Sequence, residues 1–261
     1  MISERSKILS LAARGAVFYV SHSGGKDSQA MYAALSRHVP ADQIVVVHAD
    51  LGEIEWKGVQ DHIRSTIAHD LNVVRAPKTF FDMVRRRAAS RPDVPAWPSS
   101  AQRQCTSDLK RGPIHTFIRR DMKRRGVTLA LNCTGLRSEE SPARSKRDPL
   151  SLNKSLSKAG REVYEYLPIQ HLTTRHVFWI IKTAGQEPFW AYASGNHRLS
   201  CVFCIMGSTG DLQNGARHRP DLYQAYLDLE AETGWTMFNG LSLRERVDGP
   251  TAEPAKAEVA A

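Results

Sequence analysis

Apolar runs alternate with stretches of helical periodicity along the first two thirds of the chain. Short runs rich in β-branched and aromatic residues predict buried strands at residues 16–20, 43–47, 72–74, 127–131 and 163–167. Apolar residues at helical spacing predict helices at residues 3–14, 29–35, 55–70, 80–89 and around 114–122. Strands that alternate with helices in this way predict an α/β fold with a doubly wound parallel sheet.

The last third of the chain has a less regular pattern. Residues 142–162 are polar and basic, which predicts a loop that becomes ordered on binding. Residues 163–167 would then be an edge strand, because Pro168 follows them directly. Further helices are predicted at residues 173–184, with Thr173 or Thr174 as the N-cap, and at residues 220–232.

The organisation that follows is one main domain with a C-terminal extension. We expect a main domain over residues 1–170 and a helical segment that contains a pair of cysteines over residues 171–246. From Val247 onward the chain consists mainly of Ala, Glu, Lys and Pro without an apolar period. This composition predicts a disordered tail at residues 247–261.

A turn rich in glycine and serine joins the first predicted strand to the following helix. A helix N-terminus offers unpaired N–H groups and the positive end of the helix dipole, so such a turn can bind an anion closely. Lys26 is its only formal positive charge, and we expect it to be exposed and to contact a phosphate. The chemistry is that of a phosphate site, although a turn that merely caps a helix is the alternative. The residues of this site are Ser21, Ser23, Gly24, Gly25, Lys26, Asp27 and Ser28.

Polar residues also follow two other predicted strands, where parallel sheets bind ligands. Asp50 and Glu53 follow the second strand and could bind a ribose or a Mg²⁺ ion, or could simply cap a helix. Gly135 and Arg137 follow the fourth strand, and Arg144 lies shortly after them. Guanidinium groups suit phosphate or sulfate oxygens, while a solvated loop is the alternative for this segment.

Composition and charge narrow the class of protein. The 261 residues are 41% hydrophobic and 24% charged, which is typical of a globular protein. The chain shows neither an apolar run of membrane-spanning length nor an N-terminal signal core, so we expect a cytoplasmic protein without membrane association. The net charge of +9 favours polyanionic partners, a nucleic acid among them. Two basic clusters, at residues 85–87 and 123–125, are expected to be solvated helix faces.

Four cysteines in such a chain favour a metal or redox role over structural disulfides. Cys201 and Cys204 have a CxxC spacing that suits zinc, an iron–sulfur cluster or a redox pair. Cys133, at the end of a predicted strand, is expected to be a small buried residue.

Three sequence blocks carry a resemblance to a known family. The turn Ser23–Ser28 is similar to the pyrophosphate loop of the ATP pyrophosphatase superfamily; it is not a Walker loop, because the earlier glycine of that motif is missing. With the Cys105–Lys110 block and the Gly135–Arg144 block, the chain resembles the phosphoadenosine phosphosulfate (PAPS) reductase branch, including its members in phage genomes and in DNA phosphorothioation systems. The resemblance covers about residues 15 to 210 and implies the adenine nucleotide alpha hydrolase-like fold.

The resemblance also implies roles for the residues of these blocks. The loop would grip the β- and γ-phosphates of ATP, or the anionic end of PAPS or adenylyl sulfate (APS), with Lys26 and Arg137 as catalytic residues. The Gly135 loop, with Arg137 and Arg144, would close over that anionic end. Three ligands of a [4Fe–4S] cluster would be Cys105, Cys201 and Cys204, with structural zinc as the alternative.

Two departures from the family shape the expected function. Position 104 is glutamine where iron–sulfur assimilatory reductases have a second adjacent cysteine, and no cysteine follows Cys204 where thiol-dependent reductases have a catalytic one. We therefore expect ATP-dependent activation with pyrophosphate release, coupled to sulfur transfer from a donor protein to a nucleic acid. A phosphosulfate reductase of sulfate assimilation and a nucleotide-binding subunit without turnover remain as alternatives.

Overall fold

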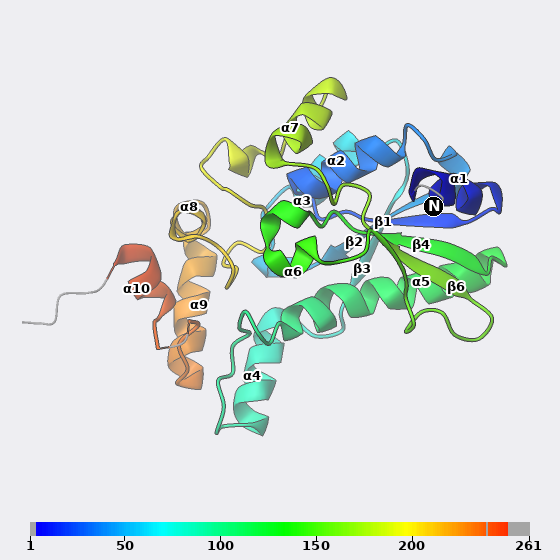
Figure 1. The fold of residues 1–261 in the computed structure, drawn as a ribbon. Coiled ribbons are helices and arrows are strands. Elements are labelled where there is room, and N and C mark those ends of the chain that lie inside the picture. Colours follow the sequence, from blue (N-terminus) through cyan, green and yellow to red (C-terminus); the bar gives the residue numbers. More distant parts are fainter. Residues whose placement is uncertain (1–3, 239, 250–261) are drawn as a thin grey trace, which may run out of the picture.

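A six-stranded sheet forms the centre of the protein in the computed structural model, which describes residues 4–238 and 240–249 (Figure 1). The strands are β1 (Val17–Ser21), β2 (Ile44–Asp50), β3 (Leu71–Arg75), β4 (Leu129–Cys133), β5 (Leu150–Leu152) and β6 (Glu162–Tyr166). Their order is β3-β2-β1-β4-β6-β5, and every pair is parallel except β5 with β6. This arrangement confirms the predicted α/β class.

Helices cover both faces of the sheet. They are α1 (Glu4–Ala13), α2 (Lys26–Leu35), α3 (Val59–Thr66), α4 (Phe80–Ser90), α5 (Gly112–Arg125), α6 (Pro142–Ser145), α7 (Thr174–Thr183), α8 (Thr209–His218), α9 (Pro220–Thr233) and α10 (Leu243–Asp248). Successive side chains of β1 point to opposite faces, as strand geometry requires. Phe18 therefore packs with α1, α2 and α7, whereas Tyr19 packs with α5. Figure 1 shows α2 and α7 on one side of the strands and α5 on the other.

The predicted loop at residues 142–162 contains regular structure. It forms α6 and β5, and β5 pairs with β6 from Leu150 opposite Tyr166 to Leu152 opposite Tyr164. The edge strand beside β6 is thus β5, and the expectation that residues 163–167 form the edge is wrong. A strand of three residues is too short to show an apolar pattern in its own sequence. It forms mainly because it pairs with a neighbouring strand.

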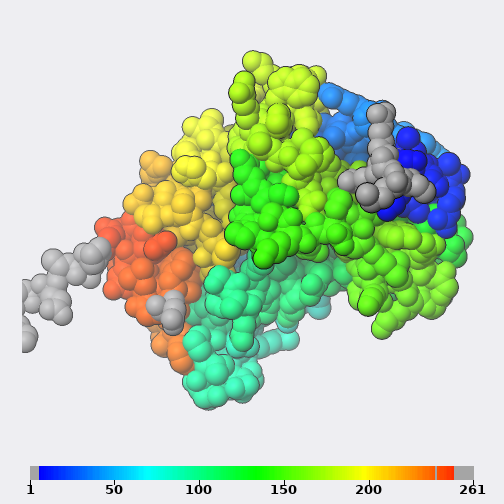
Figure 2. Space-filling model, in the orientation of Figure 1, coloured from blue at the N-terminus to red at the C-terminus, as the bar shows by residue number. Residues whose placement is uncertain are grey.

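The C-terminal segment shares its core with the helices of the first part. Phe80 of α4 stacks on Tyr226 of α9, with ring centroids 5.6 Å apart. Leu212 of α8 and Leu243 of α10 belong to the same buried cluster. Figure 2 shows the orange and red C-terminal segments directly beside the cyan segment that contains α4. The boundary predicted at residue 170 therefore does not separate two hydrophobic cores.

Two helix ends behave as their sequences indicate. Thr173 is the N-cap of α7, as predicted, and its hydroxyl accepts a hydrogen bond from the His176 N–H at 3.3 Å. At the C-terminus, α10 continues to Asp248 and Val247 is buried, so the tail predicted from residue 247 begins later than expected. The remainder of that prediction, from residue 250, lies outside the described residues.

Candidate functional site

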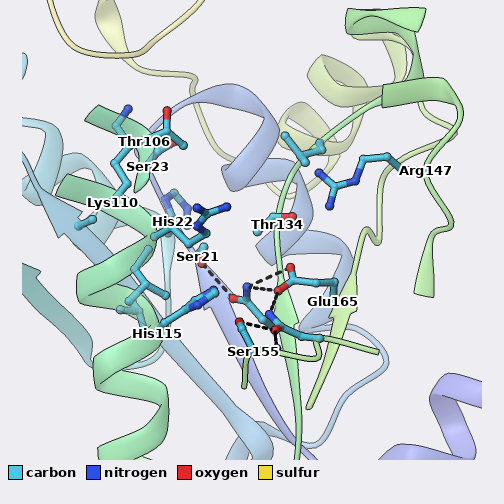
Figure 3. Close-up of a pocket in the computed structure, with 17 residues that line it drawn as sticks. Ser21, His22, Ser23, Thr106, Lys110, His115, Thr134, Arg147, Ser155 and Glu165 are labelled. Atoms are coloured by element: carbon cyan, nitrogen blue, oxygen red, sulfur yellow. Dashed lines mark hydrogen bonds between the residues drawn. The ribbon is translucent and has the colours of Figure 1, made fainter. Parts of the chain in front are cut away.

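A cavity of about 750 Å³ lies at the carboxyl ends of β1, β2, β4 and β6. The Ser21–Ser23 segment, which follows β1, forms one wall, and the π-helical turn Thr106–Arg111 with the start of α5 forms another. In Figure 3, Lys110 and Arg147 lie on opposite sides of the cavity with Ser21 and Glu165 between them. This is the place where open α/β sheets bind ligands.

A polar network forms the floor of the cavity. The Glu165 carboxylate accepts hydrogen bonds from the Asn132 amide at 3.0 and 3.1 Å and from the Asn153 amide at 2.5 Å. The Ser21 hydroxyl lies 3.5 Å from the Asn132 carbonyl oxygen. Because Glu165 holds both amides, the floor presents fixed donors and acceptors to a ligand.

Three cations surround this floor without an acidic partner. Lys110 and Arg111 approach from the α5 side and Arg147 approaches from the segment before β5. Within residues 4–238 and 240–249, none of the three forms an ion pair. The cavity therefore presents uncompensated positive charge to its contents.

His115 lies between these cations and the polar floor. Burial lowers its pKa, while the nearby Glu165 carboxylate opposes this effect. A neutral imidazole in this position can accept a proton near neutral pH.

The glycine-rich turn has the backbone geometry that its sequence predicts. Gly24 adopts a φ of +77°, and a Cβ there would lie 2.8 Å from a methyl of Val59. Gly25 is the N-cap of α2, and the Ser28 hydroxyl donates back to the Gly25 carbonyl at 2.9 Å. The turn is thus built at a helix N-terminus, where N–H groups lack helical partners.

His22 fixes the turn from inside. Its Nδ1 accepts the Gly24 N–H at 3.1 Å, so the imidazole must be unprotonated on that nitrogen. Burial and the neighbouring His48 lower the pKa of His22 to about 3. A protonated His22 would lose this contact.

Lys26 is not the exposed side chain expected from the sequence. It is 6% exposed, and its ammonium lies 2.9 Å from the Asp27 carboxylate and 5.5 Å from the ring centre of Tyr192. The Tyr192 hydroxyl also accepts the Lys26 N–H at 3.0 Å. The Lys26 side chain is buried because the segment that contains Tyr192 and Leu199 packs directly over the glycine turn.

Arg137 is buried in the same network and does not line the cavity. Its guanidinium donates to Asp27 at 2.7 Å, to Glu139, to the Leu172 carbonyl at 3.2 Å and to Thr174 at 3.1 Å. Burial alone would lower its pKa, but the charges of Asp27 and Glu139 raise it. The two predicted catalytic cations therefore share one carboxylate, Asp27.

Gly135 allows the loop after β4 to approach the glycine-rich turn closely. A Cβ at Gly135 would lie 3.0 Å from the backbone carbonyl of Asp27 and 3.1 Å from the Ser28 nitrogen. Only glycine permits this approach without a backbone shift.

The remaining predicted nucleotide ligands lie outside the cavity. Asp50 pairs with Arg75 at 2.5 Å and accepts the Gly52 N–H at 2.7 Å. Arg144 pairs with Glu140. The structure thus brings Ser21 and Ser23 to the cavity, whereas the carboxylate and guanidinium groups predicted beside them are engaged elsewhere.

Three cysteines lie close together, and the fourth is separate from them. A hydrogen bond between the two thiols raises the pKa of Cys201 and lowers that of Cys204; the charge of Lys110 lowers the pKa of both, and Cys105 raises that of Cys201. Lys110 also lines the cavity, so the thiols adjoin it. Cys133 is fully buried below the cavity, and burial with the Glu165 charge raises its pKa.

The donor chemistry around these thiols suits a metal group, although no preformed metal site is present among the described residues. No set of three or more His, Cys, Asp or Glu side chains in that part of the chain is arranged to hold an ion. Two buried donors nearby nevertheless have no hydrogen-bond partner: the hydroxyl of Tyr226, which senses the charges of all three thiols, and the amide nitrogen of Gln104. Thiolates with unpartnered donors beside them fit an iron–sulfur cluster or zinc.

The chain belongs to the phosphoadenosine phosphosulfate reductase domain family, which matches residues 17–206. An uncharacterized protein of Methanocaldococcus jannaschii is 24% identical over 210 residues, which cover 79% of this chain and 40% of that protein. This chain therefore spans less than half the length of that relative.

Two solved structures, from Candida auris and Candida glabrata, are among those similar to this chain. A phosphoadenylyl-sulfate reductase from Candida auris in a phosphate complex has a TM-score of 0.48 and 14% identity, over 75% of this chain and 86% of that one. An FMN adenylyltransferase from Candida glabrata with FMN and an ATP analogue has a TM-score of 0.49 and 14% identity, over 77% and 59%. No helix in the described part of the protein is long and apolar enough to cross a membrane.

Several cavity residues were not identified from the sequence. Lys110 and Ile114 are one helical turn apart and line the same wall of the cavity. Their four-residue spacing in the sequence indicates that they share one face of a helix. Asn132 directly follows the fourth predicted strand and Glu165 lies inside the fifth; a polar residue near the carboxyl end of a parallel strand is itself a signal of a site. Arg147 gave no such signal.

Proposed function

We propose that this protein binds an adenine nucleotide in the cavity and uses ATP to activate a nucleic acid for sulfur transfer. The observation that carries the proposal is the composition of the cavity: serines of the glycine turn on one side, unpaired cations on the other, and three thiols adjoining Lys110. We also propose that the chain belongs to the DNA phosphorothioation-like branch of the family. Mg²⁺ would arrive with the triphosphate.

The activation step follows from the position of these groups. An oxygen of the nucleic acid attacks the α-phosphorus of ATP, the bond to the bridging oxygen breaks, and pyrophosphate leaves with the electron pair. The N-terminus of α2 with Ser21 and Ser23 stabilises the leaving pyrophosphate. Lys110 and Arg147 hold the remaining phosphate, and neutral His115 accepts the proton of the attacking group.

The second step exchanges oxygen for sulfur without net oxidation or reduction. A hydrosulfide from a sulfur-donor protein attacks the adenylated atom, and AMP leaves with the oxygen. Cys105, Cys201 and Cys204 would hold a [4Fe–4S] cluster, or zinc as the alternative, and such a group supplies affinity for sulfide beside the cavity. The hydroxyl of Tyr226 and the amide nitrogen of Gln104, which have no hydrogen-bond partner, would be available to such a group.

Pyrophosphate release tests the activation step. Purified protein with ATP, Mg²⁺ and total cellular RNA or denatured DNA should release pyrophosphate, and His115→Ala should reduce the rate at least tenfold while the exposed-site variant His38→Ala should not. No release with any nucleic acid would contradict the proposal.

Reduction of a phosphosulfate nucleotide is the second candidate, and membership of the family favours it. The absence of a cysteine after Cys204 in the sequence opposes it. Tighter binding of labelled PAPS than of ATP, with release of sulfite on addition of a reductant, would establish this candidate instead. Nucleotide binding without either product would indicate a non-catalytic subunit.

The metal proposal has its own test. Protein purified without oxygen should contain iron and a brown chromophore, which Cys105→Ser, Cys201→Ser or Cys204→Ser should abolish. Cys133→Ser is the matched control and should retain the chromophore. Stoichiometric zinc without iron, or loss of the chromophore in Cys133→Ser alone, would contradict the cluster.

A further inference from the structure

We infer that the outer surface of α5 is a binding track for a single nucleic-acid strand that ends at the cavity. The inference rests on the proposed function for the class of partner. It adds the surface on which the strand lies and the path of that strand along α5 toward the cavity. The track residues are Arg111, His115, Arg119, Arg120 and Lys123.

The spacing of the track residues places them along one line. Arg111, His115, Arg119 and Lys123 follow one another at intervals of four residues, so they lie on one face of the helix. At 1.5 Å per residue the line is about 18 Å long.

The cations of the track are free, whereas their neighbours on the same helix are not. Arg124 and Arg125 both pair with the buried carboxylate of Asp121, which also accepts the Tyr19 hydroxyl at 3.0 Å. The side chains of Arg120 and Lys123 are exposed and form no ion pair or hydrogen bond within the described residues. Arg119 donates only to the Thr116 hydroxyl one turn earlier, at 2.9 Å.

Hollows connect the track to the cavity. A second cavity of about 760 Å³ shares His115 and Ser155 with the first, and it is also lined by Arg119 and Arg120. A third, of about 700 Å³, shares those two arginines and adds Lys123. The three hollows therefore follow one another along α5.

The chemistry of this path favours a nucleic-acid strand. The second hollow contains the half-buried ring of Phe117 and the apolar rings of Pro77 and Pro113, on which bases can pack. Its one acid, Asp108, is neutralised by Lys78 at 2.6 Å. A base must leave a duplex to enter a pocket of this kind, so a single strand is the form that can reach both regions.

The test measures binding of a labelled single-stranded oligonucleotide of about 20 nucleotides as a function of salt. The track variant carries Arg119→Ala, Arg120→Ala and Lys123→Ala together. We expect its affinity to fall at least tenfold, and the slope of log K against log salt to become shallower by about 2, because three phosphate contacts are lost.

A matched variant removes the same charge from the other face of the protein. It carries Arg37→Ala, Arg175→Ala and Lys182→Ala, three exposed residues on the α2 and α7 side. Its affinity and salt slope should equal those of the wild type. Equal binding by both triple variants would overturn the track, as would wild-type binding to phosphatidylserine vesicles that is tighter than binding to the oligonucleotide.

The assay contains no ATP, so it separates this inference from the proposed function. Track-dependent binding by a protein that never releases pyrophosphate would leave the track standing and refute the activation step. If instead the protein releases pyrophosphate and the track variant binds the oligonucleotide normally, the activation step stands and the track is refuted.

Discussion

The glycine turn and the start of α5 face the same cavity, but they hold their positive charges differently. Beside the turn, Lys26 and Arg137 are buried and both pair with Asp27. On the opposite walls, Lys110, Arg111 and Arg147 have no acidic partner within the described residues. The first set stabilises a conformation, and the second set remains available to a ligand.

This difference shows that membership of a motif does not determine what a cation does. A charge that is already paired contributes little additional attraction to an anion, because the partner carboxylate cancels much of its field. Removal of a paired cation should therefore reduce stability, and removal of an unpaired one should reduce binding. The following predictions test this division.

The largest expected effect is that of Arg137→Ala. The variant removes the buried donors to Asp27, Glu139, the Leu172 carbonyl and Thr174, although Lys26 stays beside Asp27. We expect this to lower the free energy of unfolding by about 3–5 kcal/mol. Urea denaturation measures this loss. Arg14→Ala, which breaks the exposed pair with Glu162, should change stability little; similar losses in both variants would contradict the structural role of Arg137.

Gly135→Ala should have the next largest effect. The new Cβ would contact backbone atoms of Asp27 and Ser28, which cannot rotate away, so we expect a loss of about 1–3 kcal/mol. Gly210→Ala is the control, because the nearest atom to its Cβ is the Ser208 hydroxyl at 3.8 Å. Thermal unfolding measures both variants. Equal midpoints would show that Gly135 does not approach the Asp27 and Ser28 backbone as closely as described.

The smallest effect concerns His22 and pH. Its folded-state pKa of about 3 lies below the usual value of 6.5, so the unfolded chain binds a proton first as pH falls. The resulting stability is complete above pH 6.5 and is lost progressively toward pH 3. Between pH 6.5 and 5.5 the loss is about 1 kcal/mol, and below that range it approaches about 1.4 kcal/mol for each pH unit.

His22→Asn should remove this part of the pH dependence, whereas the exposed His38→Asn should not. The comparison with wild type is necessary because the pKa of His48 changes in the opposite direction: burial would lower it, but the Glu55 carboxylate raises it. Unfolding curves at several pH values give the slopes, and an unchanged slope in His22→Asn would show that this imidazole titrates normally.

The parts of the fold that sequence could predict are those defined locally. The turn Ser21–Ser28 joins a strand to a helix within a few residues, so its pattern is complete in itself. Thr173 likewise caps α7 through atoms three residues away. Such features need no knowledge of the tertiary structure.

The parts that sequence could not predict depend on distant pairing. Arg147 reaches the cavity because β5 pairs antiparallel with β6, and the three residues of β5 carry almost no pattern of their own. The burial of Lys26 likewise depends on Tyr192, far along the chain. Whether a cation is paired is a property of the fold, and the local sequence does not contain it.

The central claim is that the nucleotide is held by the unpaired cations of the cavity. Calorimetric titration with a non-hydrolysable ATP analogue and Mg²⁺ tests it through Lys110→Ala and Arg144→Ala, since Arg144 pairs with Glu140 outside the cavity. We predict at least a tenfold loss of affinity for Lys110→Ala, about 1.4 kcal/mol, and wild-type affinity for Arg144→Ala. Unchanged affinity in Lys110→Ala together with a large loss in Arg144→Ala would contradict the account.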